Sequence, residues 1–285
     1  MQIINKKLKF LIVGLGLIGG SYAKALTRLG YHVSAIDLDP DSVAYALGQG
    51  FIEKGAVLPN PEILGEADAV IFALYPTAFR EWIDVNQNLL KPGALLTDVT
   101  GVKSCIVRDI QAMLRPDLEF IAAHPMAGRE VSGVRNADDR IFLNANYIVT
   151  PTEKNTQEAV EWCKALGRLL GCRKISVLSP EEHDRMIGFV SQLTHCIAVA
   201  LMTCSDNTHL VDYTGDSFRD LTRIAKINES MWSELFLLNK DELIGQMDLF
   251  MEELADIRTM LSEHDRDGLM EKMRLSTRRR GYFDV

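Results

Sequence analysis

The feature that most constrains the fold is a glycine-spaced turn near the start of the chain. Gly14, Gly16 and Gly19 follow an apolar run over residues 8–14, and a helical pattern over 18–29 comes next. In this spacing the first glycine makes a tight turn, and the second lets an anionic group approach the backbone. The third lets the helix pack closely against its strand. The motif predicts a strand, a turn and a helix whose first N–H groups face an anion.

Short apolar runs alternate with helical patterns through the first part of the chain. The runs expected to be strands are 8–14, 32–37, 67–74, 94–99, 118–123, 146–150 and 173–178. Strands that alternate with helices of this length form βαβ units, which build a parallel sheet. We therefore expect an α/β domain with a Rossmann-type parallel sheet over residues 1–178.

The pattern changes after Leu178, because no convincing strand follows. Ser179 and Glu182 predict a capping box around Pro180, and Asn239 with Glu242 repeats that signal. Helical apolar spacing continues beyond both starts. We expect an all-α helical domain over residues 179–285, which would bind substrate and form the dimer contact.

An acidic residue supports dinucleotide binding by the glycine turn. Asp37 ends the second expected strand, 23 positions after Gly14. A carboxylate there accepts a hydrogen bond from a ribose 2′-hydroxyl and repels a 2′-phosphate, which favours NAD over NADP. The alternative is a glycine-rich turn in an unliganded α/β fold. The cofactor-binding candidates are Gly14, Gly16, Leu17, Ile18, Gly19 and Asp37.

Composition excludes several function classes. The net charge of −8 argues against nucleic-acid binding, which needs a basic surface. Five cysteines, without a CxxC pair, indicate neither a zinc site nor a disulfide framework. We therefore expect a cytoplasmic protein with no metal, whose partner is a small-molecule substrate.

A stretch without Asp, Glu, Lys or Arg runs from Met186 to Ser205. Its length alone would permit a membrane span. Polar residues from Ser191 to His195 interrupt it where polar groups are costly in a membrane. We expect no membrane contact, and a helix buried in the helical domain or in the core of a homodimer.

Two segments follow expected strands, at the sheet edge where such folds bind ligands. One is 98–103, and the other begins at His124, which could act as a base near neutral pH. The alternative is a loop histidine bonded to backbone. On the later helix, the spacing of Asp184, Gly188, Ser191 and His195 places them on one face. The alternative there is a histidine satisfied inside the core.

Four segments together resemble the prephenate/arogenate dehydrogenase family of tyrosine biosynthesis. They are residues 14–21, 124–128, 179–195 and 218–226. The resemblance covers most of the chain from about Leu8. It implies a Rossmann domain followed by a helical dimerisation domain.

The resemblance also implies roles for individual residues. His124 corresponds to the histidine that accepts a hydrogen bond from the substrate's ring hydroxyl, and Arg223 to the arginine that binds substrate carboxylate. His195 and Ser191 match polar residues of the substrate pocket, and Glu130 resembles an acidic residue near its entrance. The remaining substrate-binding candidates are Gln192 and Arg129.

The chain departs from the family pattern at two places. Gly101 stands where the family often has serine, and the preceding Thr100 is the candidate that supplies the hydroxyl as a catalytic residue. Gln192 and Thr194 replace a histidine and a proline near His195. Substrate recognition is the role most exposed to these changes.

The implied activity is NAD-dependent oxidative decarboxylation of prephenate to 4-hydroxyphenylpyruvate. Three alternatives remain open. An arogenate dehydrogenase would give tyrosine directly. A 3-hydroxyacid-type dehydrogenase would need a catalytic lysine in the helical domain, which could only be Lys226. A non-catalytic NAD-binding protein would keep only the fold.

Overall fold

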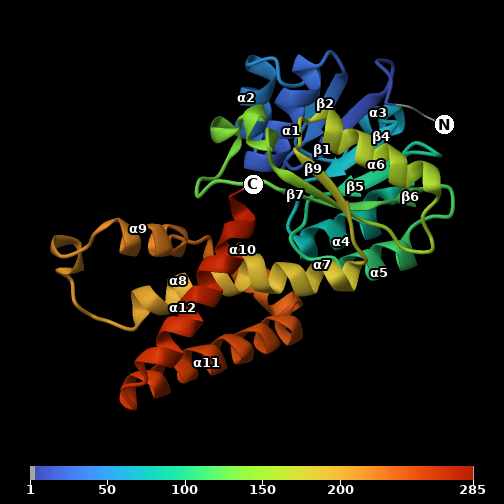
Figure 1. Cartoon of the computed structure of the whole chain (residues 1–285). Coiled ribbons are helices and arrows are strands. Elements are labelled where there is room, and N and C mark those ends of the chain that lie inside the picture. The colour runs from blue at the N-terminus through green and yellow to red at the C-terminus, as the bar shows by residue number, and fades with distance from the viewer. Residues whose placement is uncertain (1–3, 285) are drawn as a thin grey trace.

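Six parallel strands in the order β3-β2-β1-β4-β5-β6 form the main sheet of the first part of the chain (Figure 1). In the computed structural model, which describes residues 4–284, they are β1 Lys9–Val13, β2 His32–Ile36, β3 Lys54–Ala56, β4 Ala69–Phe72, β5 Leu95–Asp98 and β6 Glu119–Phe120. The helices between them are α1 Leu17–Arg28, α2 Pro40–Gly48, α3 Pro61–Glu66, α4 Pro76–Asn86 and α5 Ser104–Met113. The predicted Rossmann-type sheet is confirmed. Strand order reverses between β1 and β4, and open sheets of this kind bind ligands at such a point.

Both faces of this sheet are buried, which explains why its strands are continuous apolar runs. Along β1, Phe10 and Ile12 point into one apolar core, while Leu11 and Val13 point into the other. Alternate side chains of a strand face opposite sides of a sheet. Helices must therefore cover both sides, as βαβ connections require.

A second, three-stranded sheet corrects one prediction. The expected strand 118–123 breaks after β6, and the chain continues as β7 Ala122–Met126 in a different sheet. There β7 pairs antiparallel with β8 Asn146–Thr150, which pairs parallel with β9 Lys174–Val177. Helix α6 Gln157–Leu169 joins β8 to β9. His124 thus lies inside a strand, opposite Ile148, and not in a loop after one.

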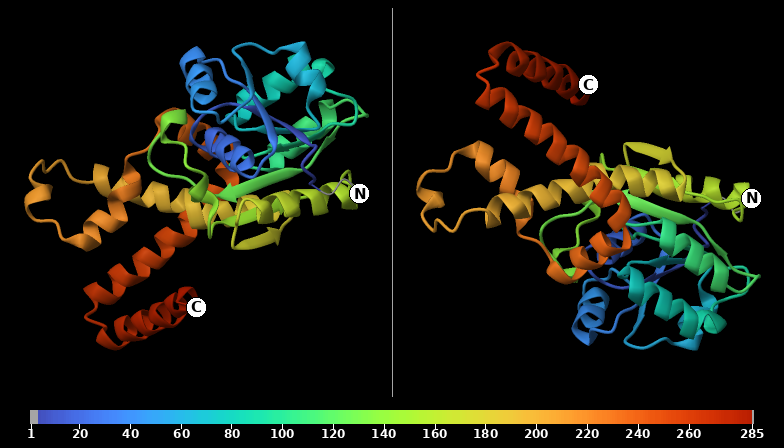
Figure 2. Two further views of the ribbon diagram at one scale, coloured as in Figure 1. Left: turned by 90° about the horizontal axis from the view of Figure 1, so that it is seen from above. Right: turned by 90° about the horizontal axis from the view of Figure 1, so that it is seen from below.

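The second part of the described chain, residues 179–284, is helical and contains no strand. Its α-helices are α7 Pro180–Ile187, α8 Thr194–Thr203, α9 Asp216–Thr222, α10 Glu229–Leu238, α11 Lys240–Ser262 and α12 Arg266–Arg280. The predicted capping box at Ser179 is present in full, with Glu182 bonding back to the cap. Helices α11 and α12 form a hairpin that projects away from the sheets in both views of Figure 2.

Helices α7 and α8 are one continuous helix joined by a π-helical segment, η4 Gly188–Leu193. The segment Pro180–Thr203 is long and apolar enough to cross a membrane by length and composition alone, and only 28% of its apolar window is buried within the chain. Of the two predicted surroundings, burial within the helical domain of one chain is therefore not found for most of this segment, and burial in a dimer core stays a prediction.

Helix α10 returns to the sheet part and joins the two halves. Its Leu235 is buried in the apolar core that contains β4 and β5. The Glu234 carboxylate accepts a hydrogen bond from the Thr77 backbone N–H, 2.7 Å away, at the start of α4. A ligand site at the carboxyl edge of the sheet is therefore bordered by helices from both halves.

Asn239 does not cap α11 as predicted. Its side chain is buried and donates to the carbonyl oxygen of Asp184 at 2.9 Å and to Gln192 Oε1 at 2.7 Å. The amide side chain instead fastens α11 to the long α7–α8 helix. Tertiary contacts thus override the local capping signal.

Candidate active site

The glycine turn has the geometry that a dinucleotide requires. Gly14 has φ +97°, and a Cβ on it would lie 2.5 Å from the Ala73 carbonyl oxygen. A Cβ on Gly19 would lie 1.8 Å from the Gly14 carbonyl oxygen, so α1 approaches the strand too closely for any side chain. A Cβ on Gly16, by contrast, would meet no atom within 4 Å. The turn is therefore tightly packed against the protein at Gly14 and Gly19, and it leaves space for a ligand at Gly16.

The start of α1 and the end of β2 complete this cofactor site. No side chain caps α1, and no acidic residue lies in its first turn, so the N–H groups of Leu17 and Ile18 are available to an anion. The Asp37 carboxylate accepts hydrogen bonds from the backbone N–H groups of Leu15 and Asp39. These bonds fix the carboxylate while each oxygen retains capacity for a ribose hydroxyl. The residues present therefore fit a dinucleotide such as NAD.

A buried ion pair lies at the carboxyl end of β5. Lys103 Nζ is 2.6 Å from Asp98 Oδ2, and both side chains are fully buried. The Thr100 hydroxyl bonds to the Asp98 carboxylate and accepts from Lys103 Nζ at 3.1 Å. The other Asp98 oxygen accepts from the Ala123 backbone N–H at 3.1 Å, which holds β7 against β5.

This network accounts for the hydrogen bonds of the Thr100 hydroxyl, which lie within the Asp98–Lys103 pair and with the Val102 carbonyl oxygen. The catalytic role predicted for Thr100 stays a prediction. The space beside the histidine belongs to Gly101, where a Cβ would lie 3.9 Å from His124 Cε1 and 3.5 Å from Leu235 Cδ1. The structure therefore places Gly101, not Thr100, next to the ring of His124.

His124 is held by a hydrogen bond from the helical half. Its Nδ1 is 2.9 Å from His183 Nε2 on α7, while its Nε2 has no hydrogen-bond partner within residues 4–284. Burial, with the neighbouring His183 and Lys103, holds the pKa of His124 well below the usual 6.5. The imidazole is therefore neutral near pH 7 and offers one free ring nitrogen, as a general base needs.

A second polar cluster lies on the helical side. His195 stacks on Trp232 of α10 with ring centroids 3.7 Å apart, and its Nδ1 is 2.8 Å from the Ser191 carbonyl oxygen. Arg223, in the short helix η6 Arg223–Ala225, forms an ion pair with Glu130 from the loop after β7. Burial lowers the pKa of His195, and the charges of Glu130 and Arg223 both act on it. The structure thus brings four of the predicted substrate-binding residues together: Ser191, His195, Glu130 and Arg223.

Two family models match the chain in sequence. Residues 22–176 match the nucleotide-binding domain of prephenate dehydrogenase, and residues 179–275 match the dimerization domain of prephenate dehydrogenase. The chain belongs to the prephenate dehydrogenase family. Membership makes it an NAD-dependent oxidoreductase, in agreement with the fit of the glycine turn.

Named members of the prephenate dehydrogenase family align along most of the chain. A prephenate dehydrogenase of Bacillus subtilis is 34% identical over 91% of this chain and 71% of its own length. A prephenate dehydrogenase of Lactococcus lactis is 32% identical over 90% of this chain and 72% of its own. The crystal structure of the Aquifex aeolicus prephenate dehydrogenase, solved with hydroxyphenyl propionate and NAD+, superimposes with a TM-score of 0.89. It is 30% identical and covers 97% of this chain and 98% of its own.

Two predicted substrate-binding residues lie outside the polar cluster. Gln192 is buried, and its amide is satisfied at both ends, since it donates to the Leu235 carbonyl at 3.1 Å and accepts from Asn239. The extra residue per turn in the π-helical segment moves Gln192 to the inner side of the helix. Arg129 pairs with Asp138 at 2.7 Å, on the side of α1.

The same π-helical segment breaks the predicted polar face. Asp184 is buried against the start of α5 and does not line a pocket with His195. Lys226, the lysine that a 3-hydroxyacid-type enzyme of this fold would need, is exposed after η6. Sequence reasoning missed His183 and Trp232. The signal for His183 was present, because a histidine beside an acidic residue stood inside the segment 179–195 that carried the family resemblance.

Proposed function

We propose that the chain catalyses NAD-dependent oxidative decarboxylation of prephenate to 4-hydroxyphenylpyruvate, a step of tyrosine biosynthesis. The observation that carries this is the ring of His124. One nitrogen is fixed by His183 and the other is unpartnered, and the ring lies beside Gly101, just after the carboxyl end of β5 in the nucleotide-binding sheet. Family membership supplies the substrate class, and the free nitrogen supplies the base.

The cofactor end of the site is assigned to the glycine turn. The open position at Gly16 and the first N–H groups of α1 receive the pyrophosphate, and Asp37 holds the adenosine ribose. NAD+, when bound, supplies the acceptor for the two electrons and the proton removed from the ring carbon. The protein's own contribution is orientation and proton handling.

His124 handles the proton of the substrate's ring hydroxyl. Its Nε2 accepts that hydrogen bond and then the proton, as the carbon–oxygen bond becomes a carbonyl. When the ring carboxylate leaves as carbon dioxide, the electron pair of the broken carbon–carbon bond enters the ring, and the resulting phenolate takes the proton back from His124 to give the phenol. Aromatisation provides the driving force, so a correctly placed neutral imidazole is sufficient.

Arg223 is assigned to a substrate carboxylate. Its side chain is 64% exposed and, among the residues that the structure describes, forms an ion pair with Glu130 alone, itself 40% exposed. Such surface pairs contribute little free energy, so an incoming carboxylate can take over the guanidinium. His195, on which the charges of this pair act, and Ser191, whose carbonyl oxygen contacts His195 Nδ1, are assigned to the same substrate site.

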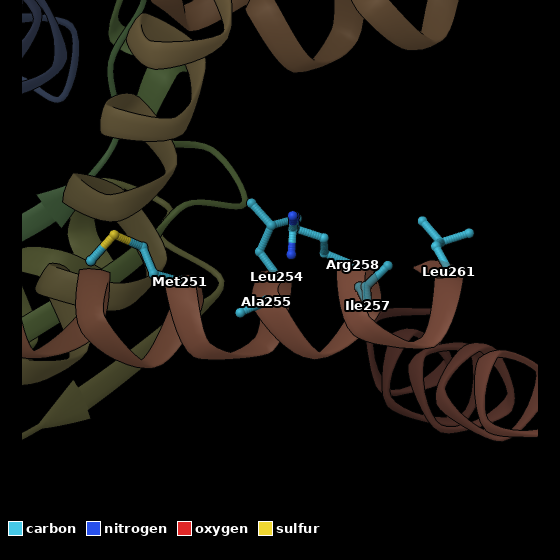
Figure 3. A pocket seen from close by; sticks show the side chains of 6 residues that line it. All are labelled: Met251, Leu254, Ala255, Ile257, Arg258 and Leu261. Atoms are coloured by element: carbon cyan, nitrogen blue, oxygen red, sulfur yellow. The ribbon is translucent and has the colours of Figure 1, made fainter. Parts of the chain in front are cut away.

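We further propose a homodimer formed through the helical half. Only Leu243 is buried among the 23 residues of α11, and α12 has no buried residue. An apolar groove of about 490 Å³ runs along α11, and Figure 3 shows Met251, Leu254 and Leu261 standing along it. Soluble monomers rarely leave apolar surface of this extent uncovered. The match to a dimerization domain supports a second copy of this chain as the partner that covers this surface.

We also propose a cytoplasmic location. The five cysteines are free, as a reducing compartment would require.

A direct assay tests the proposed reaction. The purified chain is mixed with NAD+ and prephenate, and NADH absorbance is followed with release of carbon dioxide. We expect both products in equal amounts and none without prephenate. Arogenate and NADP+ are run as alternative substrate and cofactor. Faster turnover of arogenate would reassign the substrate, and no NADH with either would contradict the proposal.

A further inference from the structure

A line of three side chains joins the helical half to the proposed base. The Asp184 carboxylate oxygen Oδ1 is 2.8 Å from His183 Nδ1, and His183 Nε2 is 2.9 Å from His124 Nδ1. His183 is fully buried, and Asp184 nearly so. The line ends at the unpartnered Nε2 of His124. Nothing in the proposed reaction itself requires the first two members.

Asp184 sets the direction of the hydrogen bonds in this line. Its two oxygens also accept from the backbone N–H groups of Lys103 at 2.8 Å and Ser104 at 2.7 Å, at the start of α5. Burial acts to raise the pKa of Asp184, but the bonds from His183 and Ser104 outweigh it and hold that pKa below its usual value. The carboxylate is therefore ionised and can only accept. His183 Nδ1 must carry the proton in the bond between them.

The positions of the remaining N–H protons follow because both histidine rings are neutral. Burial lowers the pKa of His183, so near pH 7 its ring carries a single N–H, which is the one facing Asp184. Its Nε2 is then an acceptor, and His124 Nδ1 must donate to it. Because His124 is also neutral, its Nε2 carries no proton and faces the site as a free lone pair.

We propose that His183 is a positioning residue, which with Asp184 fixes His124 in the tautomer whose Nε2 is unprotonated. This deepens the proposed function and rests on it. His183 touches neither substrate nor cofactor. A carboxylate that orients a catalytic imidazole is a recurrent arrangement in enzymes. Here a second imidazole stands between the two.

The surroundings allow no other ionisable group to replace this line. Lys103 is the nearest cation to both histidines, and its Nζ is committed to Asp98. The Asp98 carboxylate is bonded to Lys103, Thr100 and Ala123. The helix bearing Asp184 also caps α5 of the sheet domain through the same carboxylate. His124 therefore has the required tautomer only when α7 packs against the sheet domain.

The tautomer can be observed in the wild-type protein without turnover. Nitrogen-15 spectra of histidine-labelled protein distinguish a protonated from an unprotonated ring nitrogen, and the signal lost in His124→Asn identifies His124. We expect His124 protonated on Nδ1 and His183 also protonated on Nδ1. A His124 protonated on Nε2 would overturn the proposal. This result is independent of whether prephenate is the substrate.

Kinetics of His183 variants test the consequence. His183→Phe keeps a buried ring but offers no acceptor, so kcat should fall at least about tenfold, though less than the ~10²–10⁴-fold that a lost general base costs. KM for prephenate and NAD+ affinity should hardly change, because no ligand contact is removed. His183→Gln offers an amide oxygen to His124 and should recover part of kcat. His32→Phe, which alters a surface histidine paired with Glu53, is the matched control with unchanged kcat.

Asp184→Ala is a second variant, which removes the acceptor that selects the Nδ1–H form of His183. His183 can then carry its proton on Nε2 and donate to His124 Nδ1, which puts the His124 proton on Nε2. We expect a Nε2–H signal to appear for His124 and a lower kcat in a folded protein, checked by thermal melting. A folded His183→Phe or Asp184→Ala with wild-type kcat would contradict the proposal. If the wild-type protein does not turn over prephenate, that result contradicts the proposed function instead.

Discussion

At the scale of single residues, the proposed chemistry depends on one nitrogen of His124. Removing it with His124→Asn should lower kcat by about 10²–10⁴-fold and leave NAD+ affinity intact, since general-base help has that magnitude. Steady-state kinetics and cofactor titration check this. A near-normal kcat would move the base elsewhere, with His195 as the first candidate.

The pH profile provides a separate prediction for the same residue. Protonation of His124 removes the base, so kcat should fall as the pH drops through its pKa. Because burial, His183 and Lys103 hold that pKa well below 6.5, the acidic limb should lie below pH 6.5. The limb should be absent in His124→Asn. An acidic limb at or above pH 6.5 in wild type would contradict the assignment.

Arg223 should affect binding rather than turnover. Arg223→Ala removes a charge-assisted bond to a substrate carboxylate, which is worth about 1.5–3 kcal/mol, or roughly 10–150-fold in KM. Cofactor affinity should stay constant. Arg80→Ala, which breaks the surface pair with Asp109 at 3.1 Å, is the matched control. Equal loss of substrate and cofactor binding would indicate a folding defect instead.

Single residues also mark the limit of prediction from sequence. Gly14, Gly19 and Asp37 could be assigned because their roles follow from local spacing. The bond of the Thr100 hydroxyl to Asp98 could not be predicted, because it depends on how the chain folds back at the end of β5. His183 stood in the segment that carried the family resemblance, but its contact with His124, 59 positions away, could not be inferred from spacing.

At the scale of elements, periodicity found five of the six strands of the main sheet but not their pairing. The run 118–123 is apolar throughout, so nothing in it predicts the break that sends β7 into another sheet. β3 was missed because it has only three residues. The π-helical segment was missed for a related reason. An inserted residue changes the phase of a helix without changing its composition, and it altered the neighbours of Gln192.

The contact between β1 and α1 gives a prediction at this scale. Gly19→Ala would place a Cβ 1.8 Å from the Gly14 carbonyl oxygen and 3.0 Å from the Ala73 Cβ, neither of which can rotate away. We expect a destabilisation of at least about 1–3 kcal/mol, the usual cost of overpacking, together with loss of NAD+ binding. Gly65→Ala in α3 has no atom within 4 Å and is the control. Denaturant melts and cofactor titration measure both effects, and an unchanged Gly19→Ala would exclude the close packing described.

At the scale of the whole molecule, the order of an α/β part and a helical part was predictable, but their contact was not. Helix α10 returns to the sheet through Leu235, and the same packing seats Trp232, on which His195 stacks, against the core that contains β4 and β5. The sequence of α10 reads as an ordinary amphipathic helix. Which surface it covers depends on both halves being folded, so no local pattern encodes it.

The exposed helical half leads to the last prediction. Light scattering at micromolar concentration should give a dimer, because α11 and α12 leave their apolar side chains uncovered in one chain. In the double variant Leu254→Lys and Leu261→Lys, two side chains that are 55% and 60% exposed would place charges in the α11 groove. Burying an unpaired charge in an interface is costly, so we expect monomers. Leu58→Lys, at a site 67% exposed in the sheet domain, should remain dimeric. A monomeric wild type would contradict the proposed homodimer. A dimeric double variant would place the dimer contact on another face of the helical half, and the apolar side of the α7–α8 helix would be the next surface to test.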